Sequence, residues 1–264
     1  DITLANPSVG ATENAILAAC GAEGTSVIYN AAREPEIVDL QALLRSMGAR
    51  VNGAGGSIIT VEGGTALHGC THRVIGDRIV CATYLCAAAA AGGEVRLTGV
   101  DYRAVSTVAL SLAESGCEVR SEADAVSLRS TGALRSVRPV RTAPYPGFPT
   151  DAQPVLMAAL LRSEGCTVFV ENIFENRYRH VDELSRMGAE IRVAGRVAVV
   201  NGVRTLHGAA VKCTDLRGGA ALVIAGLSAE GTTRVTELTH IDRGYDAIER
   251  DLAALGAQIR RETT

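Results

Sequence analysis

A pattern repeated four times along the chain is the feature that most limits how it can fold. Each copy begins with a glycine-containing turn and a β-rich segment, and the four turns contain Gly24, Gly93, Gly165 and Gly231. Each copy then runs into a helix that ends on a small-residue signature: LLRSMGARV, LAESGCEVR, ELSRMGAEI and LAALGAQIR. Because both halves of the pattern recur in the same order, we infer a duplicated structural unit.

The copies contain two kinds of predicted helix. One kind is amphipathic, as in residues 36–49, where Ile37, Leu40 and Leu44 recur at helical spacing on one face. The other kind is apolar nearly all round, in the segments AILAAC, CATYLCAAAAA, PVLMAALL and AALVIAGL. A helix without a polar face must be buried on every side, so strands and amphipathic helices must surround it. The chain is therefore predicted to be an α/β protein, an inside-out α/β barrel of repeated βαβαββ-type units with buried central helices.

Polar residues concentrate in the loops that lead into the apolar helices. These loops read NPSVGATEN at residues 6–14, HRVIGDRI at 72–79, GFPTDAQP at 147–154 and CTDLRGGA at 213–220. Free backbone N–H groups and the helix dipole favour anions at such positions. Thr150 and Thr214 are expected to cap their helices. Arg217 opposes the dipole and is expected to face an anion or a carboxylate, for which Asp215 is one candidate.

A proline-rich stretch precedes the turn that begins the third copy. The segment RTAPYPGFPTDAQ spans residues 141–153, and five of the seven prolines lie between Pro139 and Pro154. Proline fixes its own φ and favours an extended conformation in the residue before it. The stretch is therefore either a rigid track that presents Asp151 at a defined place or a rigid connector between domains.

The composition excludes several classes of function. A net charge of −3 and an aromatic content of 3% without tryptophan argue against nucleic-acid partners and membrane surfaces. No residues have metal-ligand spacing and no GxGxxG or P-loop pattern occurs, so neither a metal nor a cofactor is expected. The seven cysteines lack CxxC pairing, which is typical of reduced thiols, and the sequence shows no signal peptide and no bilayer-spanning run. We expect a cytoplasmic protein.

Six motifs resemble one enzyme family in order along the chain. They are NPSVGATEN, NAAREPEIVDL, RTAPYPGFPTDAQ, FENRYRHVDELSRMGAE, TDLRGGAALVIAGL and HIDRGYDAIE. They are similar to those of the enolpyruvyl transferases that act on UDP-N-acetylglucosamine in the first committed step of peptidoglycan synthesis. The resemblance implies six repeat units in two domains, of which four are present here. Residues 1–62 would be the last unit of the first, nucleotide-sugar domain, and residues 63–264 three units of the second.

The resemblance also implies roles for individual residues in the transfer of an enolpyruvyl group from phosphoenolpyruvate to the sugar 3'-hydroxyl with release of phosphate. Asp151 matches the family's candidate general base and a sugar contact, and Arg217 and Arg243 match its phosphoenolpyruvate-binding arginines. Arginine suits such oxyanions because its planar fork binds them bidentately. The remaining matches to substrate-binding positions are Asn6, Pro7, Ser8, Val9, Gly10, Ile173, Glu175 and Asp215.

Several alternatives stay open. The family's N-terminal Lys-Asn pair and its proton-donating PGGCxxGxRP loop have no match, so we expect this chain by itself to be inactive. LHGCTHRVIGDR echoes that loop faintly, but we interpret its Cys70 as structural. The alternative functions are a non-catalytic module that binds a nucleotide sugar and a shikimate-pathway enolpyruvyl transferase. Glu175 could instead pair with Arg177 or Arg179, and the sequence gives no indication of oligomeric state.

Overall fold

The chain divides into two units in the computed structural model, which describes residues 1–262. Unit 1 contains Asp1–Gly76 together with Pro144–Gly147, and unit 2 contains Asp77–Ala143 and the described residues from Phe148 onward. The predicted boundary between residues 62 and 63 falls at the end of a strand, and residues 63–76 form no helix or strand.

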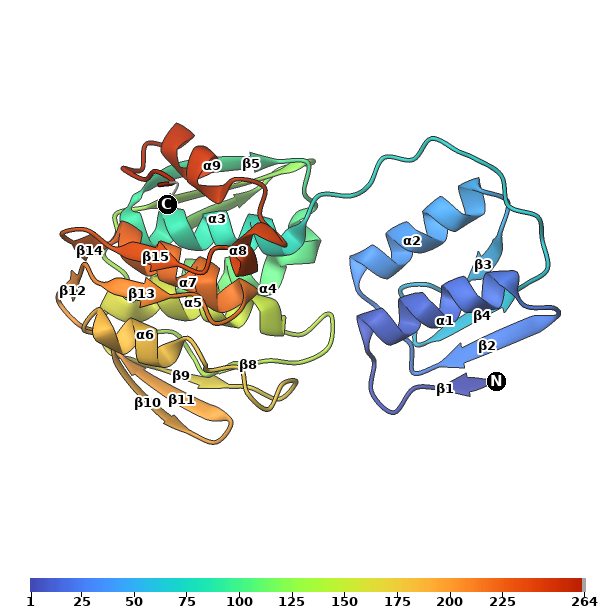
Figure 1. Ribbon diagram of the computed structural model, residues 1–264, viewed down its shortest axis with the longest axis horizontal. Coiled ribbons are helices and arrows are strands. Elements are labelled where there is room, and N and C mark those ends of the chain that lie inside the picture. The colour runs from blue at the N-terminus through green and yellow to red at the C-terminus, as the bar shows by residue number, and fades with distance from the viewer. Residues whose placement is uncertain (263–264) are drawn as a thin grey trace. The chain divides into compact units, whose positions relative to one another are not determined.

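Unit 1 is a four-stranded sheet with two helices on one face (Figure 1). Its elements are β1 (Ile2–Thr3), α1 (Val9–Gly21), β2 (Thr25–Tyr29), α2 (Pro35–Ser46), β3 (Arg50–Asn52) and β4 (Ile58–Glu62). The strand order is β1-β2-β4-β3, with β1 parallel to β2 and the other pairs antiparallel. Along β4, Ile59 and Val61 point into the core beside Ile16 of α1 and Ile37 of α2, as the period of two in a half-buried strand requires.

The prediction that α1 is buried on every side is wrong for this structure. Only Thr12, Ile16, Ala19 and Cys20 of the helix are buried, and the Leu17 side chain is 51% exposed. Unit 1 offers α1 a single sheet face and the neighbouring α2, so one side of an apolar helix is left without a partner inside its own unit.

Unit 2 surrounds three apolar helices with sheets and amphipathic helices. Its elements are α3 (Arg78–Ala91), β5 (Gly93–Thr98), α4 (Tyr102–Glu114), β6 (Glu118–Ser121), β7 (Ala125–Ser130), β8 (Val140–Arg141), η1 (Thr150–Ala152), α5 (Gln153–Ala159), η2 (Leu160–Arg162), β9 (Cys166–Val170), α6 (Val181–Arg186), β10 (Glu190–Ala194), β11 (Val197–Asn201), β12 (Leu206–His207), β13 (Ala210–Lys212), α7 (Leu216–Leu227), β14 (Ala229–Glu230), β15 (Arg234–Thr236), α8 (Thr239–Asp242) and α9 (Ile248–Ala254).

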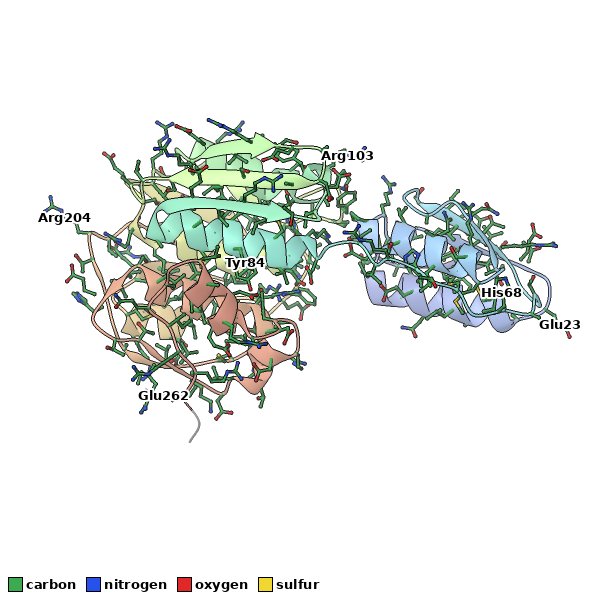
Figure 2. The ribbon with its side chains drawn as sticks, turned by 90° about the horizontal axis from the view of Figure 1, so that it is seen from above. Glu23, His68, Tyr84, Arg103, Arg204 and Glu262 are labelled. Atoms are coloured by element: carbon green, nitrogen blue, oxygen red, sulfur yellow. The ribbon has the colours of Figure 1, made fainter. Side chains whose placement is uncertain are left out.

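The central helices α3, α5 and α7 pack against one another. Every residue of α5 is buried, and so are most residues of α3 and α7. These helices confirm the prediction of apolar segments enclosed on all sides. By contrast α4 buries one stripe, with Val105, Val108 and Leu112 facing inward. In Figure 2 the exposed side chains of Arg103 and Arg204 extend outward from the unit, whereas buried Tyr84 of α3 lies inside it.

The repeated sequence pattern produces a repeated sheet topology. The first three copies each place a strand, a helix and a hairpin so that the first and third strands are neighbours: β2-β4-β3, β5-β7-β6 and β9-β11-β10. The fourth copy contributes β15 and α9, and no strand follows α9 among the described residues. Two short parallel pairs, β12 with β14 and β13 with β15, complete unit 2.

A leucine pair of opposite exposure tests the importance of the central helices. Leu156 of α5 is 0% exposed, whereas Leu110 of α4 is 61% exposed. We expect Leu156→Ala to lower the free energy of unfolding of unit 2 by about 2–5 kcal/mol, because it removes buried methyl groups and leaves a cavity. Leu110→Ala is the control and should change it by less than about 1 kcal/mol. Urea denaturation followed by circular dichroism measures both, and equal effects would contradict the buried position of α5.

Candidate functional site

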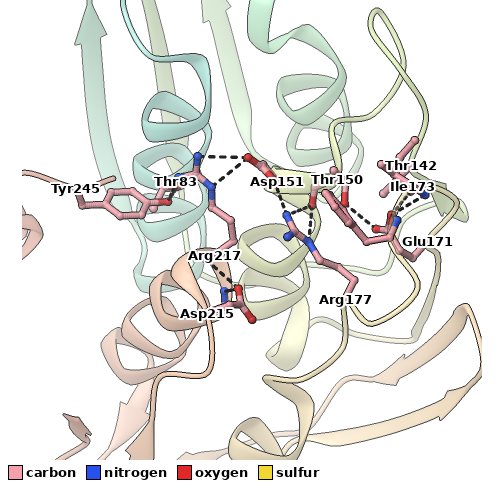
Figure 3. A network of polar contacts seen from close by, with 12 residues as sticks. Thr83, Thr142, Thr150, Asp151, Glu171, Ile173, Arg177, Asp215, Arg217 and Tyr245 are labelled. Atoms are coloured by element: carbon pink, nitrogen blue, oxygen red, sulfur yellow. Dashed lines mark hydrogen bonds and ion pairs between the residues drawn. The ribbon is translucent and has the colours of Figure 1, made fainter. Parts of the chain in front are cut away.

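The carboxylate of Asp151 lies between two arginines in unit 2 (Figure 3). Arg177 donates from Nη2 to Asp151 Oδ1 at 2.6 Å, and Arg217 approaches Oδ2 at 3.3 Å through Nη2 and 3.4 Å through Nε. Both arginine side chains are nearly buried, at 13% and 12% exposure, whereas that of Asp151 is 40% exposed. The carboxylate of Asp151 therefore reaches solvent, whereas the side chains of its two cationic partners lie mostly inside the protein.

The proline-rich stretch contains Asp151 and leads it to the position between Arg177 and Arg217. After Phe148 and Pro149 the chain enters the short 3₁₀ turn η1, of which Asp151 is the middle residue. Ala143 N–H bonds to the Phe148 carbonyl, so the stretch closes on itself just before η1. The stretch therefore contributes Asp151 to this cluster, while its residues Pro144–Gly147 belong to unit 1.

Arg217 has a second set of partners at the start of the central helices. Its Nη1 donates to the Tyr245 hydroxyl at 3.1 Å, and its guanidinium lies 5.5 Å from the centre of the Tyr245 ring. The same hydroxyl lies 2.8 Å from Thr83 Oγ1, so α3 and α7 are joined through one tyrosine. Burial raises the pKa of Tyr245, and its phenol stays protonated at neutral pH.

Aspartates, rather than the expected threonines, cap the helices. Asp215 Oδ1 accepts from the Arg217 and Gly218 N–H groups at the start of α7, while Thr214 only donates to Asp215. Thr150 donates its hydroxyl to Glu171 and caps no helix, so both threonine predictions are wrong. The aspartate carboxylate succeeds because one oxygen reaches two orphan N–H groups at once. The side-chain partner of Arg217 is Asp151, and Asp215 binds only its backbone.

The other residues predicted in unit 2 lie around this centre. Ile173 is 40% exposed and donates its N–H to Glu171. Glu175 is 92% exposed and lies 4.0 Å from Arg196, whereas Arg177, its expected partner, donates to Asp151.

Arg243 lies apart from the two arginines that hold Asp151. It is exposed at the end of α8 and lines a hollow of about 760 Å³ together with Asp77 and Tyr245. Since Tyr245 also contacts Arg217, one tyrosine is shared by the hollow at Arg243 and the ion pair at Arg217.

The five predicted residues of the first loop, Asn6 to Gly10, lie in unit 1 and lead into α1. Ser8 is the cap of this helix and its hydroxyl accepts the Ala11 N–H at 3.4 Å. Asn6, Ser8 and Gly10 are exposed, while Pro7 and Val9 are half-buried. Their backbone groups are therefore accessible at the N-terminus of a 13-residue helix.

His180 was not singled out as a site residue, yet it is fully buried beneath the cluster. Neither ring nitrogen has a hydrogen-bond partner of good geometry among the described residues, although the Arg177 backbone lies nearby. Burial lowers the pKa of His180 to about 4, with Asp215 opposing and Arg177 reinforcing the shift. Its ring is therefore neutral at physiological pH and adds no charge next to Arg177.

The cysteines are all unpaired thiols. Burial raises the pKa of Cys81 to about 12 and that of Cys213 to about 11, which makes them poor nucleophiles. Cys70, interpreted as structural, is exposed in the part of unit 1 that follows β4. Within residues 1–262, no group of three or more His, Cys, Asp or Glu side chains is placed to hold a metal ion. In the same range, no helix has both the length and the apolar character needed to cross a membrane.

Comparison with known proteins agrees with this architecture. The family model of EPSP synthase (3-phosphoshikimate 1-carboxyvinyltransferase) matches residues 1–252. The enolpyruvyl transferase NikO from Streptomyces tendae superposes with a TM-score of 0.85 at 30% identity, covering 97% of this chain and 61% of that one. EPSP synthase from Acinetobacter baumannii superposes with a TM-score of 0.76 at 20% identity, covering 100% of this chain and 63% of that one. Fold and site thus define an α/β protein of the enolpyruvyl transferase fold.

Two curated relatives share about half of their aligned residues with this chain. UDP-N-acetylglucosamine 1-carboxyvinyltransferase from Gluconacetobacter diazotrophicus is 53% identical over 98% of this chain and 62% of its own length. UDP-N-acetylglucosamine 1-carboxyvinyltransferase 1 from Symbiobacterium thermophilum is 52% identical over 99% of this chain and 59% of its own length. The chain belongs to the EPSP synthase family, and it spans about three fifths of the length of the curated relatives it matches.

Four residues of the cluster escaped the sequence reasoning or received another role there. Arg177 was considered only as a partner of Glu175, and Thr150 only as a cap. The sequence gives no expectation for Glu171 or Tyr245, although Tyr245 is part of the motif HIDRGYDAIE and Glu171 lies three residues before the motif that begins at Phe174. Their signal in the sequence is weak because a polar residue after a strand, or a tyrosine in a loop, is more often exposed than buried.

The buried histidine predicts a pH dependence of stability. Because the folded pKa of His180 is about 4 and the ordinary value is 6.5, the unfolded chain takes up the proton first as the pH falls. The stability contributed by neutral His180 is therefore complete above about pH 6.5 and is lost as the pH falls through 4. We expect His180→Gln to flatten the decline of the unfolding free energy in this window by up to about 1.4 kcal/mol per pH unit. Denaturation at several pH values measures it. The control is the exposed His68→Gln, and identical slopes in the two variants would contradict the prediction.

Proposed function

We propose that the protein transfers the enolpyruvyl group of phosphoenolpyruvate to the 3'-hydroxyl of UDP-N-acetylglucosamine and releases phosphate, a step of peptidoglycan synthesis in the cytoplasm. The carboxylate of Asp151 between Arg177 and Arg217 is the observation that carries the proposal. The 53% identity to a UDP-N-acetylglucosamine 1-carboxyvinyltransferase supports this substrate pair. The repeat topology supports four units of a larger set, with residues 1–62 as the last unit of one domain.

The proposed reaction needs a base that accepts the hydroxyl proton and cationic groups that bind the carboxylate and the phosphate of phosphoenolpyruvate. In the addition step the sugar hydroxyl oxygen bonds to C2 of phosphoenolpyruvate while C3 gains a proton. Loss of phosphate from C2 and of a proton from C3 then restores the double bond. Asp151 would accept the hydroxyl proton on Oδ2, the oxygen held more loosely, since Arg177 binds Oδ1 at 2.6 Å.

The clamps for the two anionic groups come from arginines. Arg217 and Arg243 would bind the carboxylate and the phosphate of phosphoenolpyruvate, because guanidinium groups remain charged and bind oxyanions in a fixed geometry. The accessible loop at Asn6–Gly10 would contact the nucleotide sugar with backbone groups at a helix N-terminus. Ile173, Glu175 and Asp215 would complete the substrate contacts.

A second candidate function is a non-catalytic module that binds a nucleotide sugar. The chain spans 62% of the length of one relative, and nothing in it matches the loop in which the family resemblance places the acid that protonates C3. The third candidate, transfer to a shikimate phosphate, has the family model's description in its favour. It is weaker, because the EPSP synthase structures share only 20% identity with the chain, and its loops lack a dense set of basic residues for that phosphate.

Phosphate release separates the three candidates. The purified protein is mixed with phosphoenolpyruvate and UDP-N-acetylglucosamine, each omitted in turn, and then with shikimate 3-phosphate as the acceptor. Release that requires both of the first two supports the proposal. Heat of binding of the nucleotide sugar without release supports the binding module, and release only with shikimate 3-phosphate supports the third candidate.

Replacing the proposed base tests its role directly. In a polypeptide that also carries the family's remaining units, we expect Asp151→Asn to lower kcat about 100-fold or more, since general base catalysis contributes about this much, while affinity for UDP-N-acetylglucosamine changes little. Asp124→Asn, an exposed acid between β6 and β7, is the matched control and should keep the rate of the unchanged protein. A kcat near that of the control would remove Asp151 from the role of base.

A further inference from the structure

A second carboxylate is buried next to the candidate base and takes no part in the chemistry described above. Glu171 follows β9 and is 1% exposed. Its partners among the described residues are two threonine hydroxyls and two backbone N–H groups, and none of these is a cation. Burying a carboxylate without a cationic partner costs free energy unless every acceptor site is satisfied. The position of this acid therefore calls for a reason other than stability.

The four hydrogen bonds of Glu171 join three pieces of chain (Figure 3). Oε1 accepts from Thr142 Oγ1 at 3.0 Å, and Oε2 accepts from Thr150 Oγ1 at 3.0 Å. These two threonines flank Pro144, Pro146 and Pro149 of the proline-rich stretch, so one carboxylate holds the chain on both sides of these prolines. Oε1 also accepts the N–H groups of Ile173 and Phe174, at 2.8 and 3.0 Å.

The tie to Thr150 leads directly to the candidate base. Thr150 immediately precedes Asp151, and its carbonyl accepts two bonds from Arg177, at 2.9 and 3.2 Å. Arg177 in turn donates to Asp151 Oδ1. Glu171 holds Thr150 by its side chain while Arg177 holds it by its backbone, and the segment that carries Asp151 is fixed from two directions.

We propose that Glu171 is a positioning residue that acts through the Thr150 hydroxyl to hold Asp151, and through the Ile173 N–H to hold Ile173, at the acceptor sugar. The inference rests on the proposed function. Displacement of a reacting group by about 1 Å can lower a rate about 100-fold, so a rigid anchor behind the base has a large effect on turnover. Buried and held by four hydrogen bonds, the carboxylate gives that anchor one orientation.

A substitution at Thr150 can remove its hydrogen bond to Glu171 and leave the other three hydrogen bonds of the Glu171 carboxylate in place. Thr150→Val keeps the shape of the side chain but removes the hydroxyl, whereas Thr150→Ser keeps the hydroxyl. We expect Thr150→Val to lower kcat about 10-fold or more with a change in the KM for UDP-N-acetylglucosamine of less than about threefold, and Thr150→Ser to restore most of kcat. Steady-state phosphate release measures both constants.

A remote threonine serves as the matched control. Thr167 is 0% exposed at the other end of β9, and its hydroxyl accepts the Val137 N–H at 3.2 Å. Thr167→Val also removes a buried hydroxyl, so it should lower the melting temperature but leave kcat unchanged. A Thr150→Val variant with the kcat of the unchanged protein would overturn this inference and leave the proposed function standing. A Thr150→Ser variant as slow as Thr150→Val would do the same. All these rates are measured in the polypeptide that also carries the family's remaining units. If that polypeptide, unchanged, releases no phosphate from the two substrates, the proposed function fails, whereas a Thr150→Val variant as fast as it overturns only this inference.

Discussion

The mutual burial of α3, α5 and α7 is the constraint on which the rest of unit 2 depends. None of these helices has a polar face. Strands or amphipathic helices cover α3 and α7 in addition to the other central helices, and every residue of α5 is buried. Water is therefore excluded from the centre of the unit, and hydrophobic burial is its main stabilising contribution. The charged residues of these helices stand near their starts, as Arg78 of α3 and Arg217 of α7 do. The sheets must lie outside, which reverses the usual arrangement of an α/β protein.

The ends of the central helices are where the candidate site forms. Asp151 precedes α5, Arg217 is the second residue of α7 and Thr83 lies in α3, and all are linked through the Asp151–Arg217 pair and Tyr245. Cationic side chains at the start of a helix oppose its dipole, so they need compensating anions. Asp151 supplies one such charge to Arg217. The packing that excludes water from the helices thus concentrates charge at their ends.

Unit 1 shows what the same sequence pattern does with fewer neighbours. Its apolar helix α1 packs on one sheet and on α2, and Leu17 stays half exposed. The βαββ order of the sheet is nevertheless the same as in unit 2. Local pattern therefore determines the topology of each copy, whereas the number of copies packed together determines how completely the apolar helix is buried.

Local signals are enough to predict the elements and their repetition, because periodicity, glycine turns and apolar runs act over short stretches of chain. The burial of α3, α5 and α7 and the presentation of Asp151 after the prolines followed from such local signals. Only the tertiary structure decided which charges meet. Three findings depend on contacts between residues distant in sequence. Asp151 rather than Asp215 faces the Arg217 side chain, and Thr150 binds Glu171 instead of capping a helix. The third is the burial of His180. Such contacts leave no local pattern in the sequence, since the neighbouring residues do not show whether a polar side chain contacts water or a buried partner.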